Sequence, residues 1–388
     1  MTEGALQSSI LNPQSYAFLH DRVQQAAYAL IPTEGKQMVH LNLGRLLLER
    51  ADLANTDEKL FDVAHHLNIG RDLIADGAER LALARIDLSA GQKAKSSTAY
   101  EAALDYLKAG LSLLTEERWE SDYTLAFELS VEAAECQYLC GDFDEAEQQF
   151  DLLLGRAITS LDKARVYRLR SVQYENMSRY GDALAIARES LALFGVSFPD
   201  SPEEKEAALE REIQSIQSLL GESSIESLID LPAMTDPATR MVMNTLTDIW
   251  SSAYIVGDPV LARLISATMV RLSLVHGNAA ESAYGYVTHA ITVGPVREDY
   301  KSAYEFGRLA LEVNERFNDS KRRAKIHQQF HAHVSLWRRP MQECLPYARE
   351  ACRSGLEAGD FLYAAYGACT ETWPAFLSSH DLGHFVRD

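Results

Sequence analysis

The sequence lacks an excess of basic residues, a long apolar run and a regular set of cysteines. Its 37 Lys and Arg are outnumbered by 56 Asp and Glu, which gives a net charge of −19. This charge opposes binding to nucleic-acid phosphates or to an anionic membrane, so we expect neither partner. The basic run Lys321-Arg322-Arg323 is expected to cover a solvated helix end. Five irregularly spaced cysteines, with no apolar targeting segment, favour a reducing cytoplasm.

Catalytic nucleotide-binding motifs are also missing. A P-loop needs Gly-x-x-x-x-Gly-Lys-Ser/Thr so that backbone N–H groups and a lysine can meet the phosphates, and no such run occurs. A protein kinase needs His-Arg-Asp and Asp-Phe-Gly, whereas the chain has only His20-Asp21-Arg22 and Gly-Asp-Phe starting at Gly141 and Gly359. We therefore predict that this chain is not an enzyme and holds no cofactor.

Two pairs of residues have the spacing of metal ligands on one helix face, but neither pair forms a complete metal-binding motif. His327 and His331 are four residues apart, as on one helix face, with His333 nearby, but no Glu stands where a zinc enzyme needs it. Cys136 and Cys140 have the same spacing, but Gly141 ends their helix and no second pair follows. We expect packed or solvent-facing histidines, small buried thiols and no metal. The tryptophans are expected in helix–helix contacts, not in a ligand pocket: Trp119, Trp250, Trp337 and Trp373.

The pattern that is present is helical. From about residue 82 to 193 the chain is rich in Ala, Leu, Glu, Arg and Gln, and apolar residues return every three to four positions. Ser201-Pro202 and Asp236-Pro237 place a capping side chain before a proline, which is tolerated in the first helical turn. The pattern predicts an all-α fold.

One pattern recurs after turns: a small residue, a bulky residue four positions later and another small residue three positions after that. The same pattern occurs in tetratricopeptide (TPR) repeats, where the second helix packs on the first. Small residues allow two helices to approach closely and the bulky one fills the space beside them. We therefore expect an α-solenoid of TPR-like helix pairs. The triplets are Ala102-Tyr106-Ala109, Ala146-Phe150-Leu153, Ala183-Ala187-Ser190, Ala262-Ser266-Met269, Ala303-Gly307-Ala310 and Cys344-Ala348-Ala351.

The spacing of the triplets predicts the domain organisation. Successive triplets lie about 40 residues apart, compared with about 34 in standard repeats. The interval between Ala183 and Ala262 is about twice as long. We expect residues 1–80 to form a different, N-terminal segment with connecting helices and 81–198 a first TPR-like block. We expect 199–236 to form a helix and linker, and 237–388 a second block, truncated at its C-terminus.

Several non-periodic strings resemble one family. They are Phe18-Leu19-His20-Asp21-Arg22, Phe61-Asp62-Val63-Ala64-His65-His66, Ala90-Gly91-Gln92-Lys93-Ala94-Lys95, Leu231-Pro232-x-Met234-Thr235-Asp236-Pro237 and Phe306-Gly307-Arg308-Leu309-Ala310-Leu311. They resemble the segment after the ATPase module in large bacterial proteins that join a serine/threonine kinase, a STAND-type AAA ATPase and a sensor histidine kinase. The resemblance covers nearly the whole chain.

The stretch Ser15–Arg22 is itself expected to be a short extended segment that runs into a helix. The resemblance implies that residues 1–80 contain the tail of a winged-helix, ATPase-associated element. It also implies that the helices connect the ATPase to sensor and kinase domains of a two-component signalling protein. The kinase, P-loop and transmitter of the family are absent here, so no catalytic residue can be carried over. The chain would be either an expressed fragment or an incomplete gene product.

The first hypothesis for function is a regulatory scaffold or sensor arm that binds a peptide, a protein or a small inducer. Its expected partners include the adjoining ATPase and kinase domains. The alternative is a linker within a kinase whose phosphotransfer and ATP binding are the function of the parent protein. A third reading, a metal-dependent enzyme using His327–His333, has little support. In TPR-like arrays first helices line the binding groove, and the expected groove residues are Glu128, Glu135, Tyr138, Arg165, Arg168, Gln329 and His333.

Overall fold

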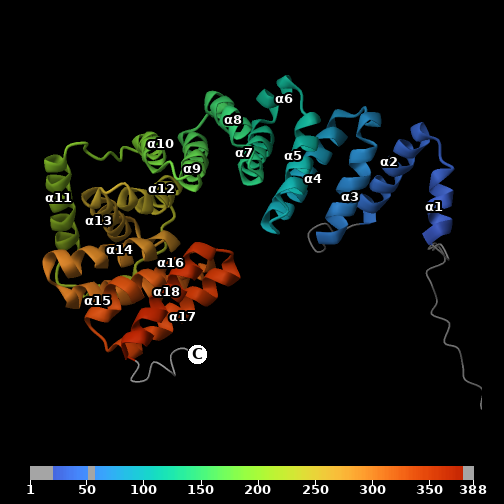
Figure 1. Cartoon of the computed structure of the whole chain (residues 1–388). Helices are drawn as coiled ribbons and strands as arrows, with labels where there is room; N and C mark the ends of the chain where they lie inside the picture. Colours follow the sequence, from blue (N-terminus) through green and yellow to red (C-terminus); the bar gives the residue numbers. More distant parts are fainter. Residues whose placement is uncertain (1–20, 51–56, 379–388) are drawn as a thin grey trace, which may run out of the picture. The chain divides into compact units, whose positions relative to one another are not determined.

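The computed structural model describes residues 21–50 and 57–378, and the regular elements in these ranges are all helical (Figure 1). The β-type pairing found in these two ranges is one isolated bridge, between Ala233 and Asn278. The expected extended segment Ser15–Leu19 lies outside the described residues. The helices are α1 (Asp21–Ala29), α2 (Thr33–Arg50), α3 (Asp57–Ile69), η1 (Arg71–Leu73), α4 (Gly77–Ser96), α5 (Tyr100–Ser112), α6 (Glu116–Ser121), α7 (Tyr123–Cys140), α8 (Phe143–Arg156), α9 (Ser160–Asn176), α10 (Tyr180–Ala192), α11 (Pro202–Leu220), η2 (Ile225–Asp230), α12 (Pro237–Ile255), α13 (Pro259–His276), α14 (Ala280–Arg297), α15 (Tyr300–Phe317), α16 (Ser320–Gln329), η3 (Phe330–Val334), η4 (Ser335–Trp337), α17 (Met341–Ala358) and α18 (Phe361–Ser378).

The chain divides into two compact units, unit 1 (Met1–Ala146) and unit 2 (Glu147–Asp388). In unit 1, α2 packs against α3, α4 against α5, and α5 against α7. Gly91 of α4 allows the close approach of α5, because a Cβ at this position would lie 2.6 Å from Cγ of Leu107. The block boundaries expected near residues 198 and 236 stay predictions.

Unit 2 is a series of antiparallel helix pairs, α9 with α10, α12 with α13, α14 with α15, and α16 with α17. The first helices also pack on one another in the order α9, α12, α14, α16, with α18 against α16. We call the surface formed by these five helices the first-helix face. This arrangement is the expected all-α solenoid of TPR-like pairs.

The small-residue triplets show why these helices pair. In five of the six, all three residues are buried, and Phe150, Ala187 and Ala348 are completely inaccessible. The first triplet was placed one residue too early. Ala102 is exposed, whereas Ala103, Leu107 and Gly110 are buried, with Gly110 packed beside Leu129.

The expected helix ends are confirmed. The side chain of Ser201 accepts a hydrogen bond from the backbone N–H of Glu204, and Asp236 accepts one from Thr239 at the start of α12. Gly141 ends α7 in the left-handed conformation, which costs glycine little because it has no Cβ. Local capping chemistry therefore determines where these helices begin and end.

One helix in the described part of the chain, α13, is long and apolar enough to span a membrane by length and composition. It packs against α11, α12 and α14, and 61% of its apolar stretch is buried inside unit 2. Its hydropathy is accounted for by its position in the core.

Candidate functional site

Charged and hydroxyl side chains from all five first helices of unit 2 meet on the first-helix face. α9 contributes an acid, α12 an acid and a serine, α14 a tyrosine, α16 a lysine and α18 a second tyrosine. We call this group the Lys325 cluster, and it consists of Glu175, Asp248, Ser251, Tyr284, Lys325 and Tyr363. Because parallel neighbouring helices place equivalent turns side by side, residues nearly 190 positions apart in the sequence become neighbours.

The ammonium group of Lys325 lies between two aromatic rings. Nζ is 5.0 Å from the ring centroid of Tyr284 and 5.0 Å from that of Tyr363. Both distances allow a cation–π attraction, worth about 0.5–2 kcal/mol each. Within the described ranges, no carboxylate forms an ion pair with Lys325. The aromatic rings fix the position of the charge but leave its N–H donors without a conventional acceptor.

Glu175 at the end of α9 is the buried acid of the cluster. Its carboxylate accepts a hydrogen bond from the hydroxyl of Ser252 on α12. Its pKa is raised to about 7, chiefly by burial and also by the nearby charge of Asp248, while Ser252 and the charge of Lys325 act in the opposite direction. Asp248 is itself paired with Arg168, whose Nε donates to Oδ2 at 2.6 Å. Glu175 is therefore the cluster acid that changes charge near neutral pH.

Tyr284 forms the floor of the cluster. Its side chain is completely buried, and its hydroxyl lies beside the hydroxyls of Ser251 and Tyr363. Burial raises the pKa of this phenol well above its ordinary value, so it stays neutral and can both donate and accept a hydrogen bond. The adjoining turn of α16 ends in the π-helical turn η3, a type of irregularity that is frequent at functional sites.

One helical turn before Lys325, a second polar group is paired within the protein. Arg322 on α16 donates to Glu281 on α14 at 2.8 Å, to Asn244 on α12 at 3.0 Å and to Asp319 at 2.7 Å. We call these four residues the Arg322 network. The expectation that the basic run 321–323 covers a solvated helix end is therefore wrong for Arg322, because its side chain is largely buried among three helices.

The groove residues predicted in unit 2 lie at or near this face. Arg168 is half-buried and pairs with Asp248, and Arg165 is half-buried one turn earlier on α9. Gln329 is buried at the end of α16, and its Oε1 has no hydrogen-bond partner within the described ranges. His333 is exposed in η3. The structure thus places Arg168 beside the Lys325 cluster and Gln329 one turn from Lys325.

The groove residues predicted in unit 1 all lie on α7. Glu135 is half-buried and accepts a hydrogen bond from Nζ of Lys95 at 2.6 Å, in a group that includes Glu132. Tyr138 is buried, and Glu128 lines a cavity of about 580 Å³ together with Arg85 and Tyr123. In contrast to Lys325, Lys95 is paired with two carboxylates. Whether any predicted groove residue binds a ligand stays a prediction.

Unit 1 holds its own buried acid, Asp87 of α4. It is completely inaccessible and accepts a hydrogen bond from Nδ2 of Asn68 at 2.6 Å. Burial raises its pKa to about 7. A cavity of about 520 Å³ nearby is lined by Asn68, Arg71 and Tyr106. The acid contacts the protein interior and not this cavity's surface, so it contributes to packing.

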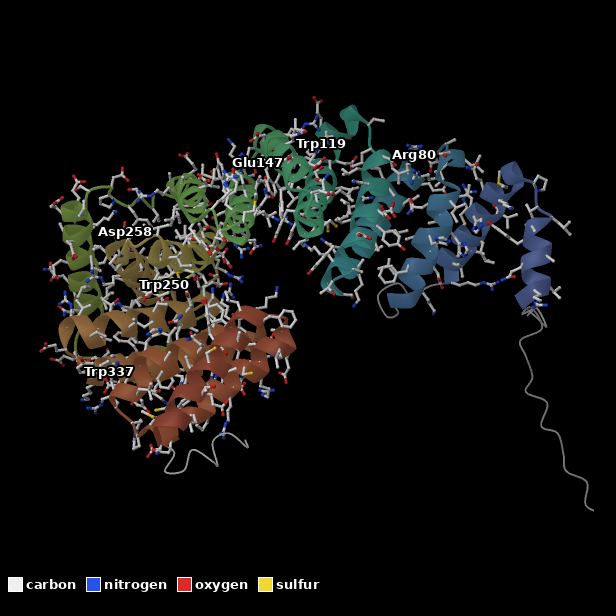
Figure 2. The ribbon with its side chains drawn as sticks, viewed as in Figure 1. Arg80, Trp119, Glu147, Trp250, Asp258 and Trp337 are labelled. Carbon is white, nitrogen blue, oxygen red and sulfur yellow. The ribbon has the colours of Figure 1, made fainter. Side chains whose placement is uncertain are left out.

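The weak metal candidates behave as packed side chains. His327 and His331 are buried, Cys136 is completely inaccessible and Cys140 is half-buried. The part of the chain that the structure describes contains no group of three or more His, Cys, Asp or Glu side chains able to hold a metal ion. Of the tryptophans labelled in Figure 2, Trp250 is buried and donates to Ser266, whereas Trp337 is 59% exposed. The core interpretation therefore fails for Trp337, and the side chain of Trp373 lies outside the described residues.

Sequence reasoning missed the residues at the centre of the cluster. Tyr284, Lys325 and Tyr363 belong to no motif and stand in three separate helices. The available signal was positional: each lies on a first helix, on a face otherwise occupied by buried residues. Aligning the first helices turn by turn would have shown an unpaired lysine between two tyrosines.

No protein-family model matches the sequence. The chain is similar to a hybrid signal transduction histidine kinase G of Dictyostelium discoideum, with 23% identity over 396 residues. This similarity covers 91% of the chain but only 12% of the length of that relative. Among solved structures, a STAND protein with a tetratricopeptide repeat sensor from Pyrococcus horikoshii has 12% identity and a TM-score of 0.33. That alignment covers 95% of this chain and 55% of the solved one.

Proposed function

We propose that this chain is a non-catalytic regulatory sensor arm of a multidomain signalling kinase, and that it binds its ligand on the first-helix face of unit 2. The similarity to a signal transduction histidine kinase, extending over most of the chain, supports the signalling context. The binding role is supported by the Lys325 cluster, in which the five first helices bring charged and hydroxyl groups to one place. ATP binding and phosphotransfer would belong to adjoining domains of a cytoplasmic parent protein.

A solenoid suits this role because each helix pair contacts mainly its neighbours. A ligand that touches several first helices at once favours one relative arrangement of the pairs over others. Such a differential affinity is what shifts a conformational equilibrium and can be passed to an adjoining domain. A peptide, a protein or a small inducer could act in this way.

A thermal-shift screen of the purified chain against metabolites of either charge, neutral compounds and peptides tests the proposal, because a ligand of the native state raises the melting temperature. Asp248→Arg replaces an anion of the first-helix face with a larger cation, so we expect it to abolish the shift produced by a cationic or neutral ligand and to change, by charge attraction, the shift produced by an anionic one. The matched control is Glu312→Arg on α15, where the acid also pairs with an arginine, Arg308. A hit whose shift is the same in Asp248→Arg as in the wild type would contradict the proposed surface, and a screen without hits would favour the linker alternative.

A further inference from the structure

We propose that the Lys325 cluster is a carboxylate-binding site, in which the Lys325 ammonium and the hydroxyls of Ser251 and Tyr363 hold a single carboxylate of the ligand. This inference rests on the proposed function and specifies the chemistry of the ligand. The carboxylate could come from a small organic acid or from the free C-terminus of a peptide, and the experiment below distinguishes these two sources.

The first argument is the unused bonding capacity of Lys325. Half-buried Lys95 is paired with Glu132 and Glu135, and buried Lys205 is paired with Asp258. Half-buried Lys36 also lies over an aromatic ring, but over a single one, that of Tyr28. Lys325 is half-buried but, within the described ranges, has ring faces as its partners and no ion pair. Ring faces attract the charge yet accept no conventional hydrogen bond. An acceptor carrying one negative charge would complete the coordination of the ammonium group.

The second argument is the position of the hydroxyl groups. Those of Tyr284, Ser251 and Tyr363 lie together, next to the two rings that hold Lys325. A carboxylate has two oxygens and accepts several hydrogen bonds, so it can take one from the ammonium and others from hydroxyls. A neutral amide of the same shape carries no net charge to offset that of Lys325. The cluster should therefore discriminate strongly between an acid and its amide.

The third argument is the charge balance, which favours a monoanion. The charges of Asp248 and Arg168 offset each other through their ion pair. Lys325 then faces Glu175, which is neutral when protonated and competes with a bound anion when ionised. A phosphate dianion carries a second negative charge that Lys325 alone does not offset and that ionised Glu175 repels at higher pH. A singly charged carboxylate suffers less from this repulsion.

The titration of Glu175 should make binding depend on pH. The groups around it are Asp248 and Ser252 from α12, Tyr284 from α14, Lys325 from α16 and, on its own helix, Arg168 through Asp248. Below pH 7 the acid is mostly protonated and the cluster has a net positive charge. Above pH 7 the ionised acid cancels this charge, so affinity for an anion should fall. Glu175→Gln should remove this dependence.

The site can be tested by NMR on the full chain after its lysines have been labelled by reductive methylation with ¹³C-formaldehyde, which keeps their positive charge. The signal of Lys325 is identified by its loss in Lys325→Arg, and Lys321, exposed on the same helix, is the internal control. The probes are succinate against succinamide for the small acid, and N-acetyl-triglycine against its C-terminal amide for the peptide end. Inorganic phosphate is a separate probe.

We expect succinate or N-acetyl-triglycine to move the Lys325 signal and leave Lys321 unchanged, with apparent affinity at least about tenfold higher than for the matching amide. The acid that binds more tightly identifies the source of the carboxylate. We expect binding to weaken several-fold from pH 6 to pH 8 in the wild type but not in Glu175→Gln. Phosphate binding as tightly as either acid, or equal movement by acid and amide, would overturn the carboxylate assignment.

An unmoved Lys325 signal with every acid would also overturn this inference. The proposed function would survive that result if the thermal-shift screen found a cationic or neutral ligand whose effect is lost in Asp248→Arg. It would fail separately if ligands of every class stabilised Asp248→Arg as well as the wild type. The two proposals therefore fail on different observations.

Discussion

Arg322 and Lys325 are one turn apart on the same helix, yet their surroundings differ in kind. Arg322 donates to Glu281, Asn244 and Asp319, so its charge is paired with acids and its guanidinium is hydrogen-bonded within the protein. Lys325 is held by ring faces and has no ion pair in the ranges that the structure describes. Polar groups on the first-helix face therefore serve two purposes. Paired groups join neighbouring helices, and the incompletely paired group can bind a ligand.

The largest effect is expected for Arg322→Met. The substitution leaves the carboxylate of Glu281 buried without its cationic partner, and breaking a buried pair in this way costs about 3–5 kcal/mol. Urea unfolding followed by circular dichroism measures this loss. Adding Glu281→Gln should restore part of the stability, because it removes the unpaired charge. A loss below about 1 kcal/mol would show that the network does not hold the helices together.

Glu175→Gln should stabilise the protein at pH 8. The folded-state pKa of about 7 lies above the ordinary value of 4.5, so the native state keeps a proton that the unfolded chain releases. Stability contributed by Glu175 therefore falls as pH rises from about 4.5 to 7, by about 3 kcal/mol in total. The difference in unfolding free energy between variant and wild type should grow across this interval and level off above it. A pH-independent difference would contradict the burial of this acid.

Lys325→Met should cost less than Arg322→Met, about 1–2 kcal/mol, because it removes two cation–π contacts and leaves no carboxylate without an ion-pair partner. The same urea titration compares the two variants directly. Lys325→Arg is the matched control, since a guanidinium keeps the charge and stacks on aromatic rings. If Lys325→Met were as damaging as Arg322→Met, the distinction between the two groups would be lost.

The smallest effect is expected for Tyr363→Phe. The ring face over Lys325 is kept and one hydroxyl is removed, so the free energy of unfolding should change by about 0.5 kcal/mol or less. Tyr363→Leu, which also removes the aromatic face, should cost more. Equal stability losses for the Phe and Leu variants would argue against a cation–π contribution from this ring.

Much of the fold was predictable because it depends on local patterns. The spacing of small and bulky residues identified the helix pairs, and Ser201, Asp236 and Gly141 marked helix ends. The first triplet was misplaced because Ala102 and Ala103 are identical in sequence and only packing distinguishes them. Arg322 was misjudged for a similar reason, since a basic run does not reveal that an acid of α14 and an amide of α12 contact it.

The candidate site was less predictable. Arg168 was identified from its position on a first helix, but its partner Asp248 is 80 residues away. Lys325, Tyr284 and Tyr363 meet only because α14, α16 and α18 are packed in register. No spacing within one helix encodes this meeting. Such sites become visible when the turns of neighbouring first helices are compared in three dimensions.

The most direct test of ligand binding at Lys325 is to measure how succinate changes the free energy of unfolding of the wild type and of Lys325→Met. Binding to the native state alone raises this free energy by mass action. We predict that succinate stabilises the wild type and Lys321→Met, which removes an exposed lysine of the same helix, with little effect on Lys325→Met. Equal stabilisation of the wild type and Lys325→Met would contradict the assignment of Lys325 as the ligand-binding group of the first-helix face.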